Sequence, residues 1–213
     1  MTPFHVSEAR AVALRLGIVD TDQLIPARFL RRPRSPDHAR LLFHDRRFGA
    51  DGTSLSDFPL NDPRNADARI LVVDGEFGVG SAREQAAWAL YEFGFRVVVA
   101  LRFGDVFREN ALRCGILPIL LAPSIVTAIM DWLAQQPDGV LRLDLAGQRI
   151  DGWPDGPATF DIDPFDKLLL AEGLDEYALT KLQREAHERF DQYYALRFPW
   201  FASRLTPGHD GSS

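Results

Sequence analysis

Residues 70–100 read ILVVDGEFGVGSAREQAAWALYEFGFRVVVA, and this stretch decides the fold. Ile70–Val73 predicts a buried strand, Asp74–Gly80 a glycine-bearing loop, and Ser81–Phe93 a helix. A second apolar run follows at once at Arg96–Ala100. This β-loop-α-β order predicts an α/β fold, in which the chemistry usually lies where a strand gives way to a helix.

The flanking sequence extends this pattern in both directions. Leu14–Val19 predicts a short strand that ends in a polar turn, and Ala27–Asn65 is a long connection of the kind that is usually functional. Further elements are expected downstream: a helix at 104–114, a strand at 116–121 in which Pro118 indicates an edge or a bulge, a helix at 123–136, a hairpin from 140–145 to 149–150, a strand at 158–162, and helices at 163–171 and 179–196. We therefore predict one domain over residues 1–205 with a C-terminal helical extension, and a disordered tail at 206–213.

Charge and hydropathy narrow the class of partner. The 213 residues hold 24 Lys and Arg against 30 Asp and Glu, a net charge of -6 that gives no overall attraction to nucleic acid or to an anionic membrane. A local cluster of arginines at 28–34 is either a solvated face or a patch that recognises an anion. No apolar run approaches the ~18 residues of a membrane span, and the first ten residues do not resemble a signal peptide. A cytoplasmic protein is expected.

Metal-ligating residues are sparse. Cys114 is the only cysteine, so the chain has no internal disulfide and cannot by itself hold an iron–sulfur cluster, which needs about three or four thiolates. The five histidines are scattered without ligand spacing. We expect no metal bound by this chain alone.

The glycines at 78 and 80 suggest two kinds of anion site. A dinucleotide fingerprint would need a third glycine where Arg83 stands, and an acidic residue near the end of the second strand, where Ala100-Leu101-Arg102 stands instead. Nucleotide binding is therefore disfavoured. A simpler anion site at the start of the helix remains, because free N–H groups and the helix dipole favour negative charge there.

The polar residues near this junction each have a plain and a functional interpretation. Ser81 is typical of a helix cap, with Glu84 completing a capping box, or it is a catalytic group. Arg83 either pairs on the surface with Glu84 or Asp74, or it grips a carboxylate with two hydrogen bonds. The acidic pair in Asp20–Asp22 is either a turn or a source of acid–base chemistry. The residue pattern alone leaves these alternatives open.

Taken together, the motifs resemble those of the small subunits of 3-isopropylmalate dehydratase, an isomerase of leucine biosynthesis in the aconitase superfamily. The matching segments follow one order along the chain: VDTDQLIPARFL at 19–30, LFHDRRF at 42–48, FGVGSAREQAAWAL at 77–90, FGDVF at 103–107 with Asn110, GILP at 115–118, and GLD at 173–175 followed by Leu179-Thr180. The resemblance implies an α/β fold of the β/β/α type, the swivelling domain of aconitase, with C-terminal helices.

The resemblance also implies the activity. The chain would be the small subunit of a heterodimeric hydro-lyase that interconverts 2- and 3-isopropylmalate, a small dicarboxylate, by dehydration and rehydration. It would be inactive without a large subunit. That partner would carry a [4Fe–4S] cluster, which agrees with the single cysteine here, and this chain would bind no cofactor.

Roles for individual residues follow from the same resemblance. Ser81 matches the base that removes the proton next to a substrate carboxylate, and Asp22 matches an acid that supports proton handling. Arg83 matches a clamp for a substrate carboxylate. The segment 27–34 matches a specificity loop. The remaining substrate-binding residues implied are Gly80, Ala82, Arg28, Phe29 and Leu30.

Four departures from the family pattern bear on the substrate. Outside the signature, Arg102 stands where serine is common and Asp37-His38-Ala39-Arg40 stands where glycines are common. Two more lie within the signature. Ala82 stands where a second serine is usual, and Gln85 stands where histidine is usual. A related small subunit acting on another 2-alkylmalate or on a citraconate-type diacid is therefore an alternative. A non-enzymatic binding module that retained the fold is another.

Overall fold

The computed structural model describes residues 3–5, 7–174, 181 and 184, and the chain divides into two units, residues 1–173 and 174–213. The first unit carries every candidate site residue. The helix expected at 179–196 and the domain end expected at residue 205 lie outside the described residues, so both remain predictions.

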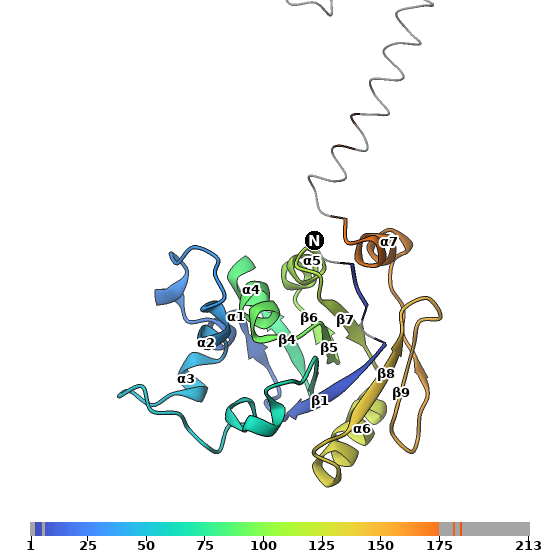
Figure 1. Ribbon diagram of the computed structural model, residues 1–213, viewed down its shortest axis with the longest axis horizontal. Helices are drawn as coiled ribbons and strands as arrows, with labels where there is room; N and C mark the ends of the chain where they lie inside the picture. Colours follow the sequence, from blue (N-terminus) through green and yellow to red (C-terminus); the bar gives the residue numbers. More distant parts are fainter. Residues whose placement is uncertain (1–2, 6, 175–180, 182–183, 185–213) are drawn as a thin grey trace, which may run out of the picture. The chain divides into compact units, whose positions relative to one another are not determined.

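The larger sheet has seven strands in the order β10-β9-β8-β1-β3-β5-β7 (Figure 1). Four of its strands are parallel: β1 (Glu8–Leu14), β3 (Ile70–Val73), β5 (Val97–Ala100) and β7 (Leu117–Leu120). The antiparallel strands are β8 (Val140–Asp144), β9 (Arg149–Asp151) and β10 (Ala158–Thr159). The strands expected at 70–73, 96–100 and 116–121 and the hairpin are confirmed, and β7 is an edge strand, as Pro118 indicated. The strand expected at 158–162 is confirmed only at Ala158–Thr159, and no strand is predicted at Glu8–Leu14, where β1 forms. The strand expected at Leu14–Val19 is wrong, because β1 ends at Leu14 and Gly17 then turns the chain with a φ of +63°.

A second, three-stranded parallel sheet has the order β2-β4-β6. Its strands are β2 (Val19–Asp20), β4 (Glu76–Val79) and β6 (Arg102–Phe103). The expectation of a loop throughout 74–80 is therefore wrong. β4 forms there because β2 and β6 pair with it on either side, which its own short sequence does not indicate.

The helices confirm the predicted pattern with one shift. They are α4 (Glu84–Phe93), α5 (Asp105–Arg113), α6 (Pro123–Gln135) and α7 (Pro164–Glu172). α4 begins three residues later than expected, with Arg83 as its N-cap. Asp163 caps α7 by accepting from two backbone N–H groups, with proline at the first helical position. Among the described residues, no helix is long and apolar enough to cross a membrane.

The large sheet buries both of its faces. In β3, Leu71 and Val73 join a core formed with α4, whereas Ile70 and Val72 join a second core formed with α6. Successive residues of a strand point to opposite faces, so a continuous apolar strand requires cover on both sides. This is the layered α/β architecture that the sequence predicts.

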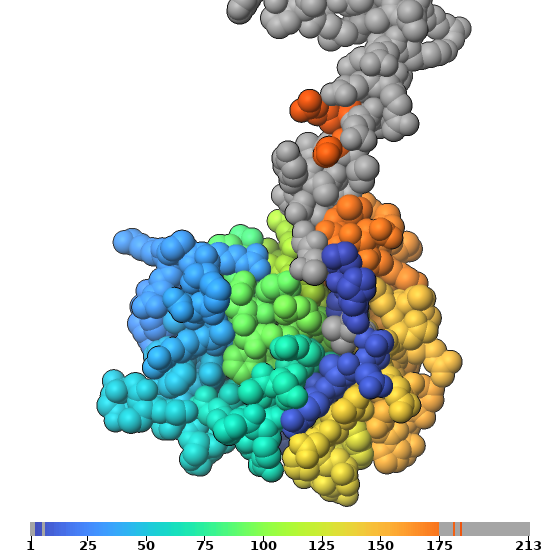
Figure 2. All heavy atoms as spheres, in the orientation of Figure 1, coloured from blue at the N-terminus to red at the C-terminus, as the bar shows by residue number. Residues whose placement is uncertain are grey.

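The connection at 27–65 is not a structureless loop. It contains five short helical turns: η1 (Ala27–Phe29), α2 (His38–Leu41), α3 (His44–Arg47), η2 (Pro59–Asn61) and η3 (Pro63–Asn65). Figure 2 shows this segment, light blue to teal, along one side of the face in view. Its buried side chains belong to the same core as those of α4, which accounts for its order.

Candidate active site

Ser81 lies in the short link between β4 and α4. Its side chain is exposed, and within the described part of the chain its Oγ makes no hydrogen bond. The backbone carbonyl of Ser81 accepts a hydrogen bond from Thr21 Oγ1 at 3.0 Å, and Thr21 is only 2% exposed. The interpretation of Ser81 as a helix cap is wrong, because Arg83 is the N-cap of α4 and no side chain caps that helix. Ser81 is instead a hydroxyl on a fixed backbone with a free Oγ.

Arg83 and Asp22 form a two-pronged ion pair across the site. Arg83 Nη1 donates to Asp22 Oδ1 at 2.5 Å and Nη2 donates to Oδ2 at 2.7 Å, and Nη1 also donates to the carbonyl of Ile25 at 3.1 Å. The Arg83 side chain is 10% exposed, whereas that of Asp22 is 60% exposed. The predicted pairing of Arg83 with Glu84 or Asp74 is not what forms. Asp74 instead accepts from the N–H groups of the turn at Leu16 and Gly17.

Among the residues that the structure describes, this ion pair leaves one edge of the Arg83 guanidinium without a partner. A guanidinium has five N–H groups, and Asp22 and Ile25 take two from Nη1 and one from Nη2. The Nε–H and the outer Nη2–H remain, and they point in one direction as a second fork that fits a carboxylate. The hydrogen bond from Arg83 lowers the pKa of Asp22, so this carboxyl group is ionised at neutral pH.

The acidic residues of Asp20–Asp22 have separate partners. Asp20 Oδ1 accepts from the backbone N–H of Gln23 at 2.8 Å and so caps α1 (Thr21–Leu24). The turn interpretation is confirmed for Asp20, and Asp22 bonds Arg83 instead. The two carboxylates therefore do not share a proton in this arrangement.

Two glycines allow the backbones around the site to approach closely. Gly78 has a φ of +70°, and a Cβ built there would lie 2.2 Å from the Phe107 ring of α5. A Cβ on Gly104, the N-cap of α5, would lie 2.3 Å from the carbonyl oxygen of Gly78. Since neither α4 nor α5 has a side-chain cap, two helix starts whose first N–H groups have no side-chain acceptor at the N-cap follow the ends of β4 and β6. Gly80, with a φ of +95°, is exposed beside Ser81 and Ala82.

The predicted specificity loop, residues 27–34, is held by contacts with α3 and α4. Arg28 donates to Asp45 through both Nη atoms, and this hydrogen bonding lowers the pKa of Asp45 to about 2. The buried Phe29 ring lies 4.8 Å from the His44 ring, centroid to centroid, with the Arg28 guanidinium 4.5 Å above it. Leu30 is half-buried, and its carbonyl accepts from Gln85 Nε2 at 3.1 Å. The four arginines of this loop are exposed.

The residues of this chain do not fit an iron–sulfur cluster. Cys114 is buried, and burial raises the pKa of its thiol to about 11, which opposes the thiolate that a metal needs. Among the described residues there is no group of three His, Cys, Asp or Glu side chains that could hold a metal ion. The described residues of this chain therefore offer no ligand set for a metal.

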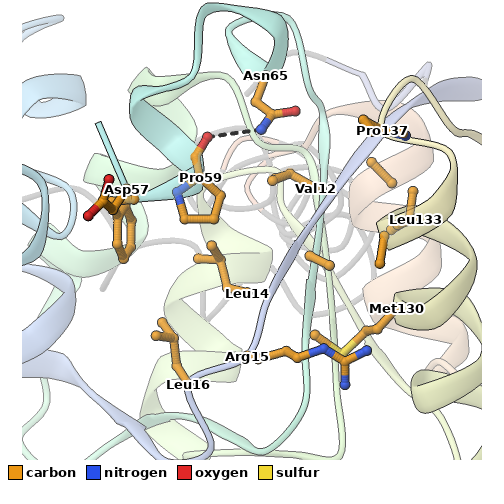
Figure 3. Close-up of a pocket in the computed structure, with 14 residues that line it drawn as sticks. Val12, Leu14, Arg15, Leu16, Asp57, Pro59, Asn65, Met130, Leu133 and Pro137 are labelled. Carbon is orange, nitrogen blue, oxygen red and sulfur yellow. Dashed lines mark hydrogen bonds between the residues drawn. The ribbon is translucent and has the colours of Figure 1, made fainter. Parts of the chain in front are cut away.

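A separate cavity of about 450 Å³ lies between β1, η2 and α6 (Figure 3). Its walls are mostly apolar: Val12 and Leu14 lie on the α4 side of β1, whereas Met130 and Leu133 of α6 line the cavity on the other side of that strand. The residues that line it include none of the candidate site residues. The candidate active site lies elsewhere, at the exposed Ser81.

The sequence does not predict the contacts of three polar groups at the site. They are the hydroxyl of Thr21, the carbonyl of Ile25 and the amide of Gln85, each of which holds a site residue through a contact distant in sequence. The position of Thr21 between two aspartates, directly after the strand that pairs with β4, is the signal that could have identified it.

The site and the fold have clear relatives. Residues 1–124 match the family model described as the aconitase C-terminal domain. The 3-isopropylmalate dehydratase small subunit of Nitrobacter hamburgensis is 38% identical over 94% of this chain and 100% of the relative, and that of Chloroflexus aggregans is 43% identical over 87% and 91%. A crystal structure of 3-isopropylmalate dehydratase from Methanocaldococcus jannaschii covers 87% of this chain and 99% of that chain, with a TM-score of 0.63 and 23% identity, which supports the fold. The chain belongs to the family of 3-isopropylmalate dehydratase small subunits, whose fold is the aconitase C-terminal domain.

Proposed function

We propose that this chain supplies the proton-transfer and carboxylate-binding groups of a 3-isopropylmalate dehydratase, a hydro-lyase of leucine biosynthesis. The observation that carries the proposal is the free, exposed Oγ of Ser81 two residues from an arginine that is fixed by Asp22 and keeps one edge free. A hydroxyl held beside a carboxylate-binding fork has the two elements that removal of a proton next to a carboxylate requires.

In the dehydration, Ser81 Oγ acts as the base. Its alkoxide takes the proton from the carbon next to the substrate carboxylate, the C–H electron pair forms the double bond, and hydroxide departs from the neighbouring carbon. In the rehydration, hydroxide adds to the carbon that lost the proton, and the electron pair of the double bond takes the proton from Ser81 onto the other carbon. The Arg83 cation and the two uncapped helix starts lower the free energy of the alkoxide.

Asp22 has an indirect role in this proposal. Since its pKa is lowered and it is ionised at neutral pH, it holds the Arg83 fork in place rather than donating a proton. The second edge of Arg83 binds the substrate carboxylate, with Gly80 and Ala82 lining the approach. Arg28, Phe29 and Leu30 form the wall that faces the alkyl group.

The partner and the location complete the proposal. A large subunit covers the exposed site in the cytoplasm and carries the [4Fe–4S] cluster, because this chain has no thiolate set to hold one. That cluster supplies Lewis-acid chemistry for the substrate hydroxyl. The exposed Ala82, without the hydroxyl usual in the family, favours testing other 2-alkylmalates and citraconate beside isopropylmalate.

The test is turnover of 2-isopropylmalate by the chain co-expressed with a cluster-bearing large subunit. Ser81→Ala is expected to lower kcat by about 10²–10⁴-fold, the usual contribution of a general base. Arg83→Lys is expected to raise KM, because lysine cannot form the two-pronged contact. Ser124→Ala, an exposed serine in the first turn of α6, is the matched control. Full turnover by Ser81→Ala would refute the assignment, and faster turnover of another diacid would change the substrate.

A further inference from the structure

One face of α4 serves as a docking surface for the segment that follows η1. Gln85, Trp88 and Glu92 lie three and seven residues apart, a spacing that places them on one side of a helix. Gln85 donates to the Leu30 carbonyl at 3.1 Å, and Glu92 accepts from Arg34 Nε at 3.2 Å. The Trp88 ring lies 5.8 Å from the Arg34 guanidinium.

The same side of α4 also holds the far end of the segment. The His38 ring, which is fully buried in α2, meets the Trp88 ring edge-on with centroids 5.7 Å apart. Arg34 adds a second cation–π contact at 5.4 Å to the Tyr91 ring. Residues 30–38 are therefore fastened to one helix at three successive places.

Of these three contacts, the one made by Gln85 lies nearest in sequence to the carboxylate-binding Arg83. Gln85 lies in the first turn of α4, two residues after the N-cap Arg83, so the carboxylate fork and the contact to the specificity loop are adjacent at the start of one helix. The side chains of η1 have other supports, since Phe29 is buried against His44 and Arg28 is paired with Asp45. Within the described residues, the Leu30 carbonyl accepts from Gln85 alone, at the point where the chain leaves η1.

We propose that Gln85 is a positioning residue for substrate selection: its amide fixes the peptide between Leu30 and Arg31, and through it the position of the Phe29-Leu30 wall relative to Arg83. This inference rests on the proposed function, because it assigns the alkyl group of the substrate to that wall. The bond is a donor–acceptor contact to a backbone carbonyl, so it requires an N–H at position 85. The residue acts on which alkyl group fits and leaves proton transfer at Ser81 unaltered.

The first test uses the isolated chain and needs no activity. Gln85→Glu keeps the shape but replaces the donor with an acceptor that repels the Leu30 carbonyl, and Gln85→Met removes the donor without that repulsion. Amide hydrogen exchange over residues 27–33 is expected to become up to about tenfold faster in Gln85→Glu and less so in Gln85→Met. Exchange in β3 and β5 stays unchanged. Gln135→Glu, on the exposed end of α6, is the charge-matched control and leaves the segment unaltered.

The second test uses the complex with the large subunit. We compare kcat/KM for 2-isopropylmalate with kcat/KM for 2-methylmalate. The ratio of the first to the second is expected to fall about three- to tenfold in Gln85→Glu. Most of this change should lie in KM, while kcat changes by less than about twofold. Ser81→Ala lowers turnover of both substrates alike. Unchanged exchange over 27–33, or an unchanged ratio of the two substrates, would overturn the role of Gln85. A wild-type complex inactive on every malate would instead overturn the proposed function, and the exchange result would still decide whether Gln85 holds the segment.

Discussion

Gly78 should be among the positions of the signature, residues 77–90, that tolerate substitution least. The structure separates the free-energy cost of a substitution there into a conformational and a packing contribution. An L-residue held at the φ of +70° found at Gly78 loses about 1–2 kcal/mol of conformational free energy. A Cβ there would also lie 2.2 Å from Cγ of Phe107, which is 3% exposed and therefore has little room to move. Such overpacking costs about 1–3 kcal/mol more. Gly78→Ala should therefore lower the free energy of unfolding by about 2–5 kcal/mol.

Gly17→Ala provides the matched comparison. Gly17 has a similar φ of +63°, yet a Cβ there would meet nothing within 4 Å, so only the conformational cost of about 1–2 kcal/mol applies. Urea unfolding of both variants, followed by far-UV circular dichroism and tryptophan fluorescence at a shared m-value, measures the difference. The cost of Gly78→Ala should be smaller in a Phe107→Ala background, which removes Cγ and Cδ1, two of the three atoms that the new Cβ would meet. Equal losses at the two glycines would refute the assignment of the extra cost to Phe107.

Three further predictions concern individual side chains. Asp45→Asn should destabilise the chain by no more than about 1 kcal/mol at pH 7, because the ion pair of Asp45 with Arg28 is exposed. The folded pKa of Asp45 is lowered to about 2, so the stability difference between wild type and variant should be fully present above the unfolded pKa and should vanish as the pH falls through 2. Urea unfolding at a series of pH values measures this difference. Cys114, with its pKa raised to about 11, should react with a thiol reagent at least about a hundredfold more slowly in the native chain than in urea. Arg47→Lys should lower the unfolding free energy by about 1–3 kcal/mol in the same assay, because lysine cannot satisfy Asn61 and two backbone carbonyls together.

The sequence predicts those parts of the fold whose signals are local. Ile70–Val73 is a continuous apolar run and is buried on both faces, and Asp163 with the following proline marks the start of α7. β4 escaped prediction because a four-residue strand with a glycine forms only when two distant strands pair with it. The late start of α4 has a similar origin, since Thr21 and Asp22 hold Ser81 and Arg83 outside the helix.

The candidate site, too, is only partly predictable from the sequence. The types of residue at 81 and 83 can be recognised from the pattern, but the partners that decide between a cap and a free hydroxyl, or between a surface pair and a fork, lie about sixty residues away. No periodicity records such a pairing. Gln85 illustrates the consequence: as a departure from the signature it only cast doubt on the substrate, whereas its contact with Leu30 gives it a specific role to test.

The exposure of Ser81 gives a physical reason for two subunits. A serine hydroxyl in water is a very weak acid, and the Arg83 cation and the helix dipoles act on it weakly while solvent screens them. Asp22, 60% exposed, shows how open this surface is in the chain alone. A partner that covers the site would lower the local dielectric constant and strengthen both interactions without moving either residue, because Thr21 and Asp22 already fix them. In our proposal the small subunit therefore contributes a preorganised arrangement, and the large subunit makes it reactive by excluding water.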